Sequence, residues 1–274
     1  MKLDFEKILR IAFKLARLGW MGRGEIAAFA SDPSLETFAA IIRKFQEFHG
    51  LELTGQLDQP TLRQIDAPRF CGLPDIMPET MDLQKWPDPN IRWAITNNWP
   101  ISRAVVKDAI SLAWAQWAAV CGVNPVYVDD PSQAHVLVQS SPIDGPMGVL
   151  AQSELANNTM NPKRQWYDNG EPWVVSEAPA ASQIDLVRVA CHEIGHVLGL
   201  PHIAAGNLLQ PTYDVRIRAP QRGDIAEVVA RYGPPRNPAP APPTTPVPPA
   251  PTPQPGAEKW LVSSAAAITF TKLP

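Results

Sequence analysis

One eleven-residue segment, from His192 to His202, constrains this 274-residue chain more than any other part of it. It reads His-Glu-Ile-Gly-His-Val-Leu-Gly-Leu-Pro-His. His192 and His196 stand four residues apart, so on a helix they share one face and can reach one ion, with Glu193 beside them. Gly199 can leave the right-handed helical region without a Cβ penalty, so the chain can turn there and return His202 as a third ligand. This spacing predicts zinc with three protein ligands and an open fourth position, which is typical of a catalytic site.

A lone His-x-x-x-His pair is more often a solvated or core-edge pair than a metal site. Here three of the five histidines of the chain fall within the segment, together with the glutamate and the glycine that the site needs. Ser182 and Asp185 predict the start of a helix through a capping box. The apolar positions of a buried helix follow at Ile184, Val187, Val189, Ile194 and Val197.

The segment resembles the signature of the metzincin zinc proteases, and its local sequence is most similar to the matrixins, the matrix-metalloprotease family. Metzincins carry a methionine turn below the zinc, and Leu209 occupies the methionine position here. A volume-conserving swap of this kind costs less than about 1.5 kcal/mol, so we expect the apolar floor of the site to survive. The resemblance also implies that Pro211 and Tyr213 wall the pocket for the substrate side chain just after the cut bond.

Cys71 lies in the stretch Pro-Arg-Phe-Cys-Gly-Leu-Pro-Asp, residues 68–75, which is similar to the matrixin cysteine switch. In that switch a propeptide thiolate, a good zinc ligand, fills the open zinc position and keeps the enzyme latent. Phe70 is an extra residue, and we expect its insertion to shift the contact of Arg69 with Asp75 and to weaken latency. The alternative is a small buried cysteine in a loop. We favour the switch because the surrounding residues match as a group.

The N-terminal part predicts a small all-α domain. Residues 3–18 have the spacing of an amphipathic helix. Residues 35–66 resemble a peptidoglycan-binding-like helical domain that also builds matrixin propeptides, with one helix that ends at Gly50 and a second from Asp58 to Ile65. The matrixin setting implies inhibition, and binding of cell-wall glycan remains an alternative. His49 is expected in a turn or on the surface.

Residues 82–233 predict an α+β domain of the metzincin type, a mixed twisted sheet plus the zinc helix. The resemblance implies that Leu150 and Ala151 form an edge strand that pairs with an extended substrate. Three strands are expected at residues 90–96, 125–128 and 135–139. Helices are expected at residues 102–119, with Val105, Ala109, Leu112 and Trp117 inward, and at residues 224–232.

An acidic loop in this domain resembles the matrixin site for structural calcium. Asp144, Gly145, Asp168 and Glu171 match positions that supply oxygen ligands, which calcium prefers. The alternative is a solvated acidic loop. The second, structural zinc of matrixins is not expected, because residues 152 and 166 are glutamine and tryptophan.

Composition limits the remaining classes of function. The formal net charge is -3 and 45% of the residues are hydrophobic, so we expect a globular chain that does not bind nucleic acid. No stretch of the sequence is apolar for the eighteen or more residues that a membrane span needs, so no span is expected. Three cysteines are too few, and odd in number, for a disulfide framework. The N-terminus does not resemble a secretory signal, although the family resemblance implies an extracellular location. A monomer is expected.

We therefore divide the chain into five parts. A helical propeptide domain (1–67) precedes the switch segment (68–81), the catalytic domain (82–233), a Pro-rich linker (234–256) and a short tail (257–274) with strands at 260–262 and 268–270. The tail is expected to dock on another chain, to be the stub of a lost domain or to be disordered. The resulting hypothesis is a latent zinc metalloendopeptidase with Glu193 as general base, which cuts extracellular or matrix-type proteins. A cell-wall binding protein and a hydrolase of wall peptides remain the alternatives.

Overall fold

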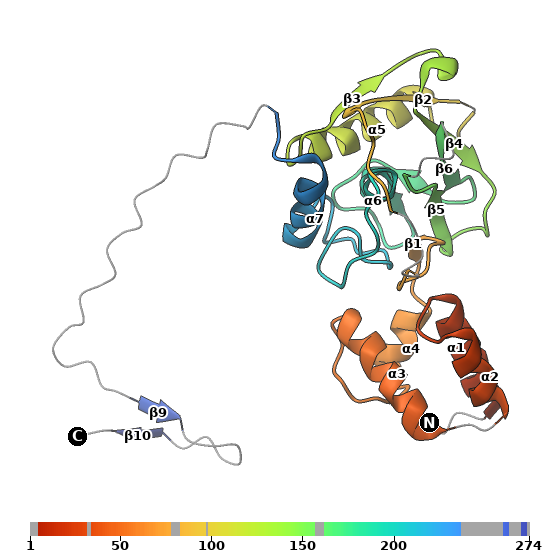
Figure 1. Cartoon of the computed structure of the whole chain (residues 1–274), viewed down its shortest axis with the longest axis vertical. Coiled ribbons are helices and arrows are strands. Elements are labelled where there is room, and N and C mark those ends of the chain that lie inside the picture. The colour runs from red at the N-terminus through yellow and green to blue at the C-terminus, as the bar shows by residue number, and fades with distance from the viewer. Residues whose placement is uncertain are drawn as a thin grey trace. The chain divides into compact units, whose positions relative to one another are not determined.

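The computed structural model describes residues 5–31, 34–77, 83–96, 98–156, 162–236, 260–262 and 270–272. The chain forms two compact units, residues 1–238 and residues 239–274. Within the first unit, a small helical domain leads into an α+β domain through one short strand (Figure 1). This arrangement confirms the predicted fold class, an α+β catalytic domain preceded by helices.

The helical domain consists of α1 (Phe5–Arg17), α2 (Arg23–Ser31), α3 (Leu35–Phe48) and α4 (Gln59–Ile65). Ser34 and Asp58 cap α3 and α4, because each side chain accepts a hydrogen bond from a backbone N–H of the first turn. The helices enclose a core of their own, which includes Leu15, Phe29, Phe38, Ile42 and Phe45. The predicted amphipathic helix is α1, and its first two expected residues, 3 and 4, lie outside the described residues.

A six-stranded mixed sheet forms the frame of the α+β domain, in the order β1-β5-β6-β4-β2-β3. The strands are β1 (Arg69–Cys71), β2 (Asn90–Ile95), β3 (Asn124–Tyr127), β4 (Val136–Ser141), β5 (Val149–Ser153) and β6 (Lys163–Asp168). Only β5 and β6 pair antiparallel within this sheet. Two short strands, β7 (Trp173–Val174) and β8 (Ile184–Asp185), pair in parallel by themselves. The edge strand β1 comes from the segment that contains Cys71, so the predicted switch is part of the sheet.

Three helices complete this domain: α5 (Arg103–Ala118), α6 (Leu186–Val197) and α7 (Arg222–Tyr232). The expected inward face of α5 is partly wrong, because Val105 and Leu112 are exposed. The buried residues are Val106, Ala109, Ile110, Ala113, Trp114 and Trp117. Ala109 and Trp117 are buried as expected, and Val106 and Ala113 are buried in place of Val105 and Leu112. Burial of a second large ring, Trp114, beside Trp117 turns the inward face toward these residues.

The start of α6 also differs from its prediction. Asp185, and not Ser182, is the N-cap, since its carboxylate accepts a hydrogen bond from the Arg188 N–H. Residues 184 and 185 form β8, so the chain enters the helix directly from a strand and Ser182 stays in an exposed turn. Every residue of α6 is buried, as expected for the helix that carries the histidines.

The second unit contains β9 (Trp260–Val262) and β10 (Phe270–Lys272), which pair antiparallel. The first of the two strands expected in the tail is confirmed as β9. The second overlaps β10 at Phe270, and its other expected residues, 268 and 269, lie outside the described residues. No described helix is long and apolar enough to span a membrane.

Candidate metal centre and substrate groove

Helix α6 and the turn that follows it bring the three predicted histidines together. His192 and His196 lie on one face of α6, and both are fully buried. The helix ends at Val197, and Gly199 adopts a φ of +82° in the turn beyond it. A Cβ at Gly199 would overlap the carbonyl oxygen of Gln84, so the turn requires glycine for two reasons. The chain then returns His202 to the same site, as the spacing predicted.

Backbone carbonyls fix the orientation of all three imidazole rings. Each ring turns its Nδ1 toward a carbonyl oxygen, which can only accept, so each Nδ1 carries the proton and each Nε2 presents a lone pair. The three contacts are His192 to Leu208 O (2.9 Å), His196 to Leu200 O (2.9 Å) and His202 to Pro74 O (2.8 Å). Burial lowers the pKa of all three histidines, to about 4 for His196, which keeps them in the neutral form that binds metals.

The Nε2 atoms and one sulfur converge on a common point. Two lone pairs face each other across 3.0 Å between His192 Nε2 and His196 Nε2. The Sγ atom of Cys71 lies 3.4 Å from His196 Nε2 and 3.2 Å from His202 Nε2. Ligand atoms around a tetrahedral zinc ion stand about 3.3–3.6 Å apart, calculated from ordinary Zn–N and Zn–S bond lengths. Nitrogen and sulfur atoms that present lone pairs repel one another at these distances unless a cation lies between them. Three imidazole nitrogens and one sulfur are ligands that suit zinc, so the cluster fits this ion.

Glu193 lies beside this cluster and is completely buried. Its Oε2 accepts a hydrogen bond from the Ser153 hydroxyl at 2.6 Å, and Gln165 donates to the same hydroxyl oxygen at 3.3 Å. Among the described residues, Glu193 Oε1 has no hydrogen-bond partner. Burial raises the pKa of Glu193 to about 8. The sequence predicted Glu193 but not Ser153, which β5 contributes from 40 residues away.

Leu209 packs directly against α6 below the histidines. A Cβ built at Gly195 would lie 2.6 Å from Leu209 Cδ2, so the leucine fills the floor position that the resemblance implied. The carboxylate of Asp224, the third residue of α7, accepts from the Leu208 N–H (2.7 Å) and the Leu209 N–H (3.0 Å). Sequence analysis did not identify this buried carboxylate, which holds the turn whose carbonyl orients His192.

The expected effect of the Phe70 insertion on the Arg69–Asp75 contact is wrong. Arg69 Nη2 and Asp75 Oδ1 form an ion pair at 2.6 Å. The insertion is accommodated because the Phe70 ring turns inward and is fully buried. It stacks on the His192 ring at 4.4 Å between centroids with an 11° interplanar angle, and it meets the Tyr213 ring edge-on at 5.2 Å.

Asp75 also contacts the helical domain, which the sequence did not indicate. Trp20 Nε1 donates to Asp75 Oδ2 at 2.8 Å, and His49 Nε2 lies 3.3 Å from the same oxygen. His49 lies in the turn after α3, as expected, but it is not at the surface, since only 7% of the residue is exposed. The helical domain docks on the switch segment and buries the imidazole between them.

The switch segment lies between the two segments that were predicted to bind substrate. On one side β1 pairs with β5 in parallel, with Arg69 opposite Val149 and Cys71 opposite Ala151. On the other side the Phe70 N–H donates to Pro211 O (2.9 Å), and the Tyr213 N–H donates to Pro68 O (2.9 Å). Leu150 and Ala151 are fully buried in β5 beneath the segment. The residues expected to hold an extended substrate thus hold part of this chain.

Comparisons with known proteins agree with this geometry. A family model described as Matrixin matches residues 85–233, which is more than half of the chain. The chain belongs to the matrixin family. It is 34% identical to interstitial collagenase from Bos taurus over 72% of this chain and 43% of that protein. It is 29% identical to matrix metalloproteinase-20 from Homo sapiens over 77% of this chain and 44% of that protein. The chain therefore spans less than half the length of these relatives.

Matrixins are zinc enzymes, and the Cys71, His192, His196 and His202 cluster is able to hold a metal ion. The four ligand atoms lie within 4.8 Å of one another, and all four residues are buried. The predicted family, fold class and zinc cofactor are confirmed at this level. The roles of the individual residues stay predictions.

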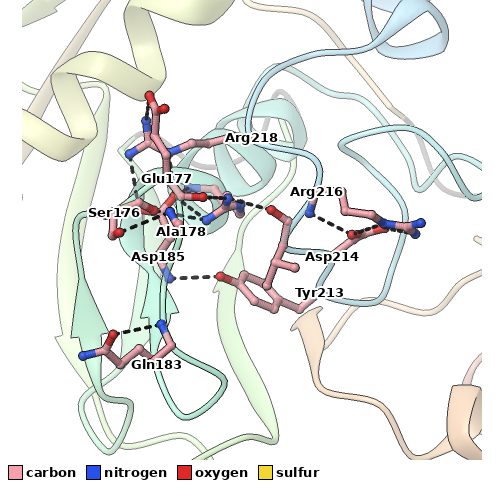
Figure 2. Close-up of polar contacts among 12 residues, drawn as sticks. Ser176, Glu177, Ala178, Gln183, Asp185, Tyr213, Asp214, Arg216 and Arg218 are labelled. Carbon is pink, nitrogen blue, oxygen red and sulfur yellow. Dashed lines mark hydrogen bonds and ion pairs between the residues drawn. The ribbon is translucent and has the colours of Figure 1, made fainter.

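An ion-pair network fixes the loop that bears Tyr213 in this matrixin (Figure 2). The Tyr213 hydroxyl accepts from the Asp185 N–H at 3.0 Å. The Asp185 carboxylate pairs with Arg188 (3.1 Å) and with Arg218 Nε (2.7 Å). Arg188 in turn donates to the carbonyl oxygens of Ser176, Glu177 and Val215. The loop that bears Tyr213 is tied to the start of α6, a link that local sequence patterns did not reveal.

The four residues of the predicted calcium site lie in one loop region. Asp168 Oδ2 accepts from the Asp144 N–H (2.9 Å) and the Gly145 N–H (2.8 Å), while Glu171 Oε1 accepts from the Met147 N–H (2.7 Å). Burial, together with the charges of Asp168 and Asp144, raises the pKa of Glu171 to about 7. These carboxylates stabilise the loop backbone, and calcium binding stays a prediction.

Proposed function

We propose that this matrixin is a zinc-dependent metalloendopeptidase that is held latent by its own N-terminal part. The observation that carries the proposal is the convergence of three Nε2 lone pairs on one buried point, with the Glu193 carboxylate beside it. His192, His196 and His202 are assigned as zinc ligands. Family membership and the donor chemistry of the cluster support that assignment.

When bound, zinc would polarise the scissile carbonyl and lower the pKa of the attacking water. Glu193 accepts a proton from that water and later passes it to the leaving amine. The Ser153 hydroxyl holds one carboxylate oxygen and leaves the other, Oε1, available for this transfer. Main-chain groups of β5, at Leu150 and Ala151, pair with an extended substrate strand, since the same strand already pairs with β1.

Latency is assigned to the helical domain (1–67) and the switch segment (68–81) acting together. Cys71 Sγ occupies the position in the cluster that a catalytic site leaves open. The neighbouring residues of β1 fill the groove on both of its sides. Burial raises the pKa of the Cys71 thiol, so a bound cation is what would hold it as thiolate. Release of this segment is the step that activates the enzyme.

Protein substrates outside the cell are part of the proposal. Curated relatives of this chain include interstitial collagenases, and a peptidase requires a groove for an extended chain. The finer substrate class and the extracellular location rest on this similarity, and a monomeric state is part of the proposal.

The test uses the full chain, purified with one equivalent of zinc. We expect a denatured protein substrate to be cut after a mercurial has blocked Cys71, and not before. Glu193→Ala is the matched control, because it should retain zinc and lose cleavage. Zinc-loaded protein with a blocked Cys71 that cuts neither denatured protein nor peptides would refute the proposal.

One observation favours a second function for the helical domain. A groove of about 750 Å³ lies between α1 and α4, and four of its nine lining residues are basic: Lys7, Arg10, Lys14 and Arg63. Such a groove suits an anionic ligand, and the carboxylates of cell-wall glycan and its peptides are candidates. Sedimentation of the full chain with insoluble peptidoglycan tests the idea, with an Arg10→Glu, Arg63→Glu variant as control. Equal sedimentation of both proteins would exclude this groove.

A further inference from the structure

Two polar side chains on the buried face of the sheet have no role in the function proposed so far. Gln165 and Tyr167 belong to β6, and both are fully buried. Ser153 lies opposite Gln165 on β5 and is buried as well. Alternation along a strand places apolar residues at such positions, and a buried polar group costs stability unless it is hydrogen-bonded. Three polar residues together on the buried face of two paired strands therefore indicate a role beyond packing.

The three side chains form a series of hydrogen bonds that ends at Glu193, here called the polar chain. The Tyr167 hydroxyl donates to Gln165 Oε1 at 3.4 Å, and Gln165 Nε2 donates to Ser153 Oγ at 3.3 Å. The Ser153 hydroxyl then donates to Glu193 Oε2 at 2.6 Å. Every donor in the polar chain points toward the carboxylate. Because the amide of Gln165 already donates to the Ser153 oxygen, the single hydroxyl proton of Ser153 is directed to Glu193.

We propose that the polar chain positions the Glu193 carboxylate for proton transfer, with Ser153, Gln165 and Tyr167 as positioning residues. The inference rests on the proposed peptidase function and adds the residues that orient its general base. The polar chain itself moves no proton, because the proton of Ser153 stays on its own oxygen. It holds Oε2 and so fixes the plane of the carboxylate. Among the described residues Glu193 Oε1 has no partner, so this atom is left to accept the proton of the attacking water.

A glutamate needs such a restraint because its last torsion is soft. Rotation about χ3 of glutamate is broad, so an unrestrained carboxylate samples many orientations of its plane. A hydrogen bond of 2.6 Å from a hydroxyl to a carboxylate is short and strong, and burial strengthens it further. The Glu193 carbonyl oxygen lies 3.2 Å from the same hydroxyl, but it is neutral and more distant, so the carboxylate is the preferred acceptor. The base is thus oriented before substrate binds, which lowers the barrier of the chemical step.

The far end of the polar chain is fixed by packing. The Tyr167 ring contacts the rings of Trp99 and Trp173, with centroids 5.2 and 6.0 Å away. Burial, with a contribution from the charge of Glu193, raises the pKa of Tyr167, so its hydroxyl keeps the proton that it donates to Gln165. The two outer hydrogen bonds are longer than the one to Glu193 and therefore weaker. The effect of a substitution should accordingly decrease from Ser153 to Tyr167.

The first measurement separates kcat from KM in the zinc-loaded full chain after a mercurial has blocked Cys71. Ser153→Ala should lower kcat at least about tenfold and leave KM within about twofold, because the lost contact acts on the reacting carboxylate and not on substrate binding. Tyr167→Phe should lower kcat by about two- to threefold. Ser153→Thr keeps the hydroxyl and should retain at least about half of the wild-type kcat.

Matched controls remove the same atoms elsewhere. Ser132→Ala changes an exposed serine before β4, and Tyr127→Phe changes a tyrosine whose ring contacts Trp93 and Lys107. Both controls should cut with the wild-type kcat, and all variants should bind the same amount of zinc. A folded Ser153→Ala protein with the wild-type kcat, or with a change in KM alone, would overturn the inference and leave the peptidase function intact.

The second measurement does not depend on activity. In crystals of the zinc-loaded full chain, the Glu193 carboxylate should adopt one orientation in the wild-type and Ser153→Thr proteins, with Oε2 at the hydroxyl. In Ser153→Ala it should rotate or divide between two orientations. The wild-type orientation in Ser153→Ala would overturn the inference even if kcat falls, because the loss would then have another cause. A wild-type chain that cuts no peptide would refute the peptidase function, and the crystals would still decide whether the polar chain orients Glu193.

Discussion

Asp75→Asn tests whether the helical domain keeps the proposed switch closed. The Asp75 carboxylate is completely buried, and its Oδ1 forms an ion pair with Arg69 Nη2 at 2.6 Å. Its Oδ2 accepts a hydrogen bond from Trp20 Nε1 at 2.8 Å and lies 3.3 Å from His49 Nε2. Two of these three groups belong to the helical domain, so one carboxylate joins that domain to the segment that bears Cys71. Removal of its charge leaves the guanidinium of Arg69, whose side chain is only 12% exposed, without its ion-pair partner.

The expected magnitude follows from the type of contact. Breaking a buried ion pair by changing one partner costs about 3–5 kcal/mol. If about 3 kcal/mol of this favours the closed over the open switch, the open population rises roughly a hundredfold, since about 1.4 kcal/mol corresponds to a factor of ten. Trp20→Phe removes one hydrogen bond to a charged group, worth about 1.5–3 kcal/mol, and should give a smaller increase of roughly tenfold or more.

The assay is the rate at which a thiol reagent modifies Cys71 in the zinc-loaded full chain. Asp66→Asn is the matched control, because Asp66 pairs with Lys14 at the surface, where 75% of its side chain is exposed. An exposed pair of this kind contributes little, so the control should label at the wild-type rate. Labelling of the folded Asp75→Asn protein no faster than the control would show that the helical domain does not hold the switch through this carboxylate.

The same site gives a pH dependence. Burial alone would raise the pKa of Asp75, but the His49 hydrogen bond, the Arg69 charge and the Trp20 hydrogen bond together hold it below its usual value. A carboxyl whose pKa is lowered in the folded protein stabilises it above the unfolded pKa and loses that effect as pH falls through the folded pKa. Labelling of Cys71 should therefore accelerate below about pH 4 in the wild-type chain and less so in Asp75→Asn. An equal acid response in the two proteins would assign the effect to other groups.

Three further variants test the site and the acidic loop. Asp224→Asn should weaken zinc binding about 10- to 100-fold, measured by competition with a chelator, because it loosens the turn whose carbonyl orients His192. Gly199→Ala should lower the melting temperature and the zinc content together, since φ is +82° and a Cβ would overlap Gln84 O; normal values for both would contradict the geometry. The pKa of Glu171 is raised to about 7, so its contribution to stability is present below about pH 4.5 and lost as pH rises toward 7. Calcium should restore the melting temperature at pH 7.5 in wild type but not in Glu171→Gln, and no effect of calcium on either protein would exclude the predicted ion.

The metal cluster was predictable from the sequence because most of its geometry is local. His192 and His196 share a helix face by spacing alone, and the need for a positive φ at Gly199 follows from the return of His202. The sulfur was found only because the residues around Cys71 resemble a known switch. The structure adds distances that residue spacing in the sequence does not give, such as the 3.0 Å between His192 Nε2 and His196 Nε2.

The residues that escaped prediction are those whose partners lie far away in the sequence. Trp20 meets Asp75 across 55 residues, and Ser153 meets Glu193 across 40. Neither pair leaves a local pattern, because a tryptophan N–H in a turn or a serine hydroxyl on a strand has many equivalent partners. The prediction of the inward face of α5 was partly wrong for a related reason, since two tryptophans and the neighbouring α6 determine which side is buried.

Phe70 shows that a departure from a family pattern carries information of its own. By sequence alone the insertion implied a disturbed switch, because one added residue displaces Arg69 relative to Cys71. In the structure the ion pair with Asp75 is retained, and the added ring fills a space bounded by His192 and Tyr213. The backbone can absorb one residue here because β1 is held by hydrogen bonds on both sides, so the extra side chain is directed inward. The insertion therefore adds a ring contact at His192 and Tyr213 to the segment that carries Cys71, and a partner that displaces this segment must remove a ring as well as the Cys71 sulfur.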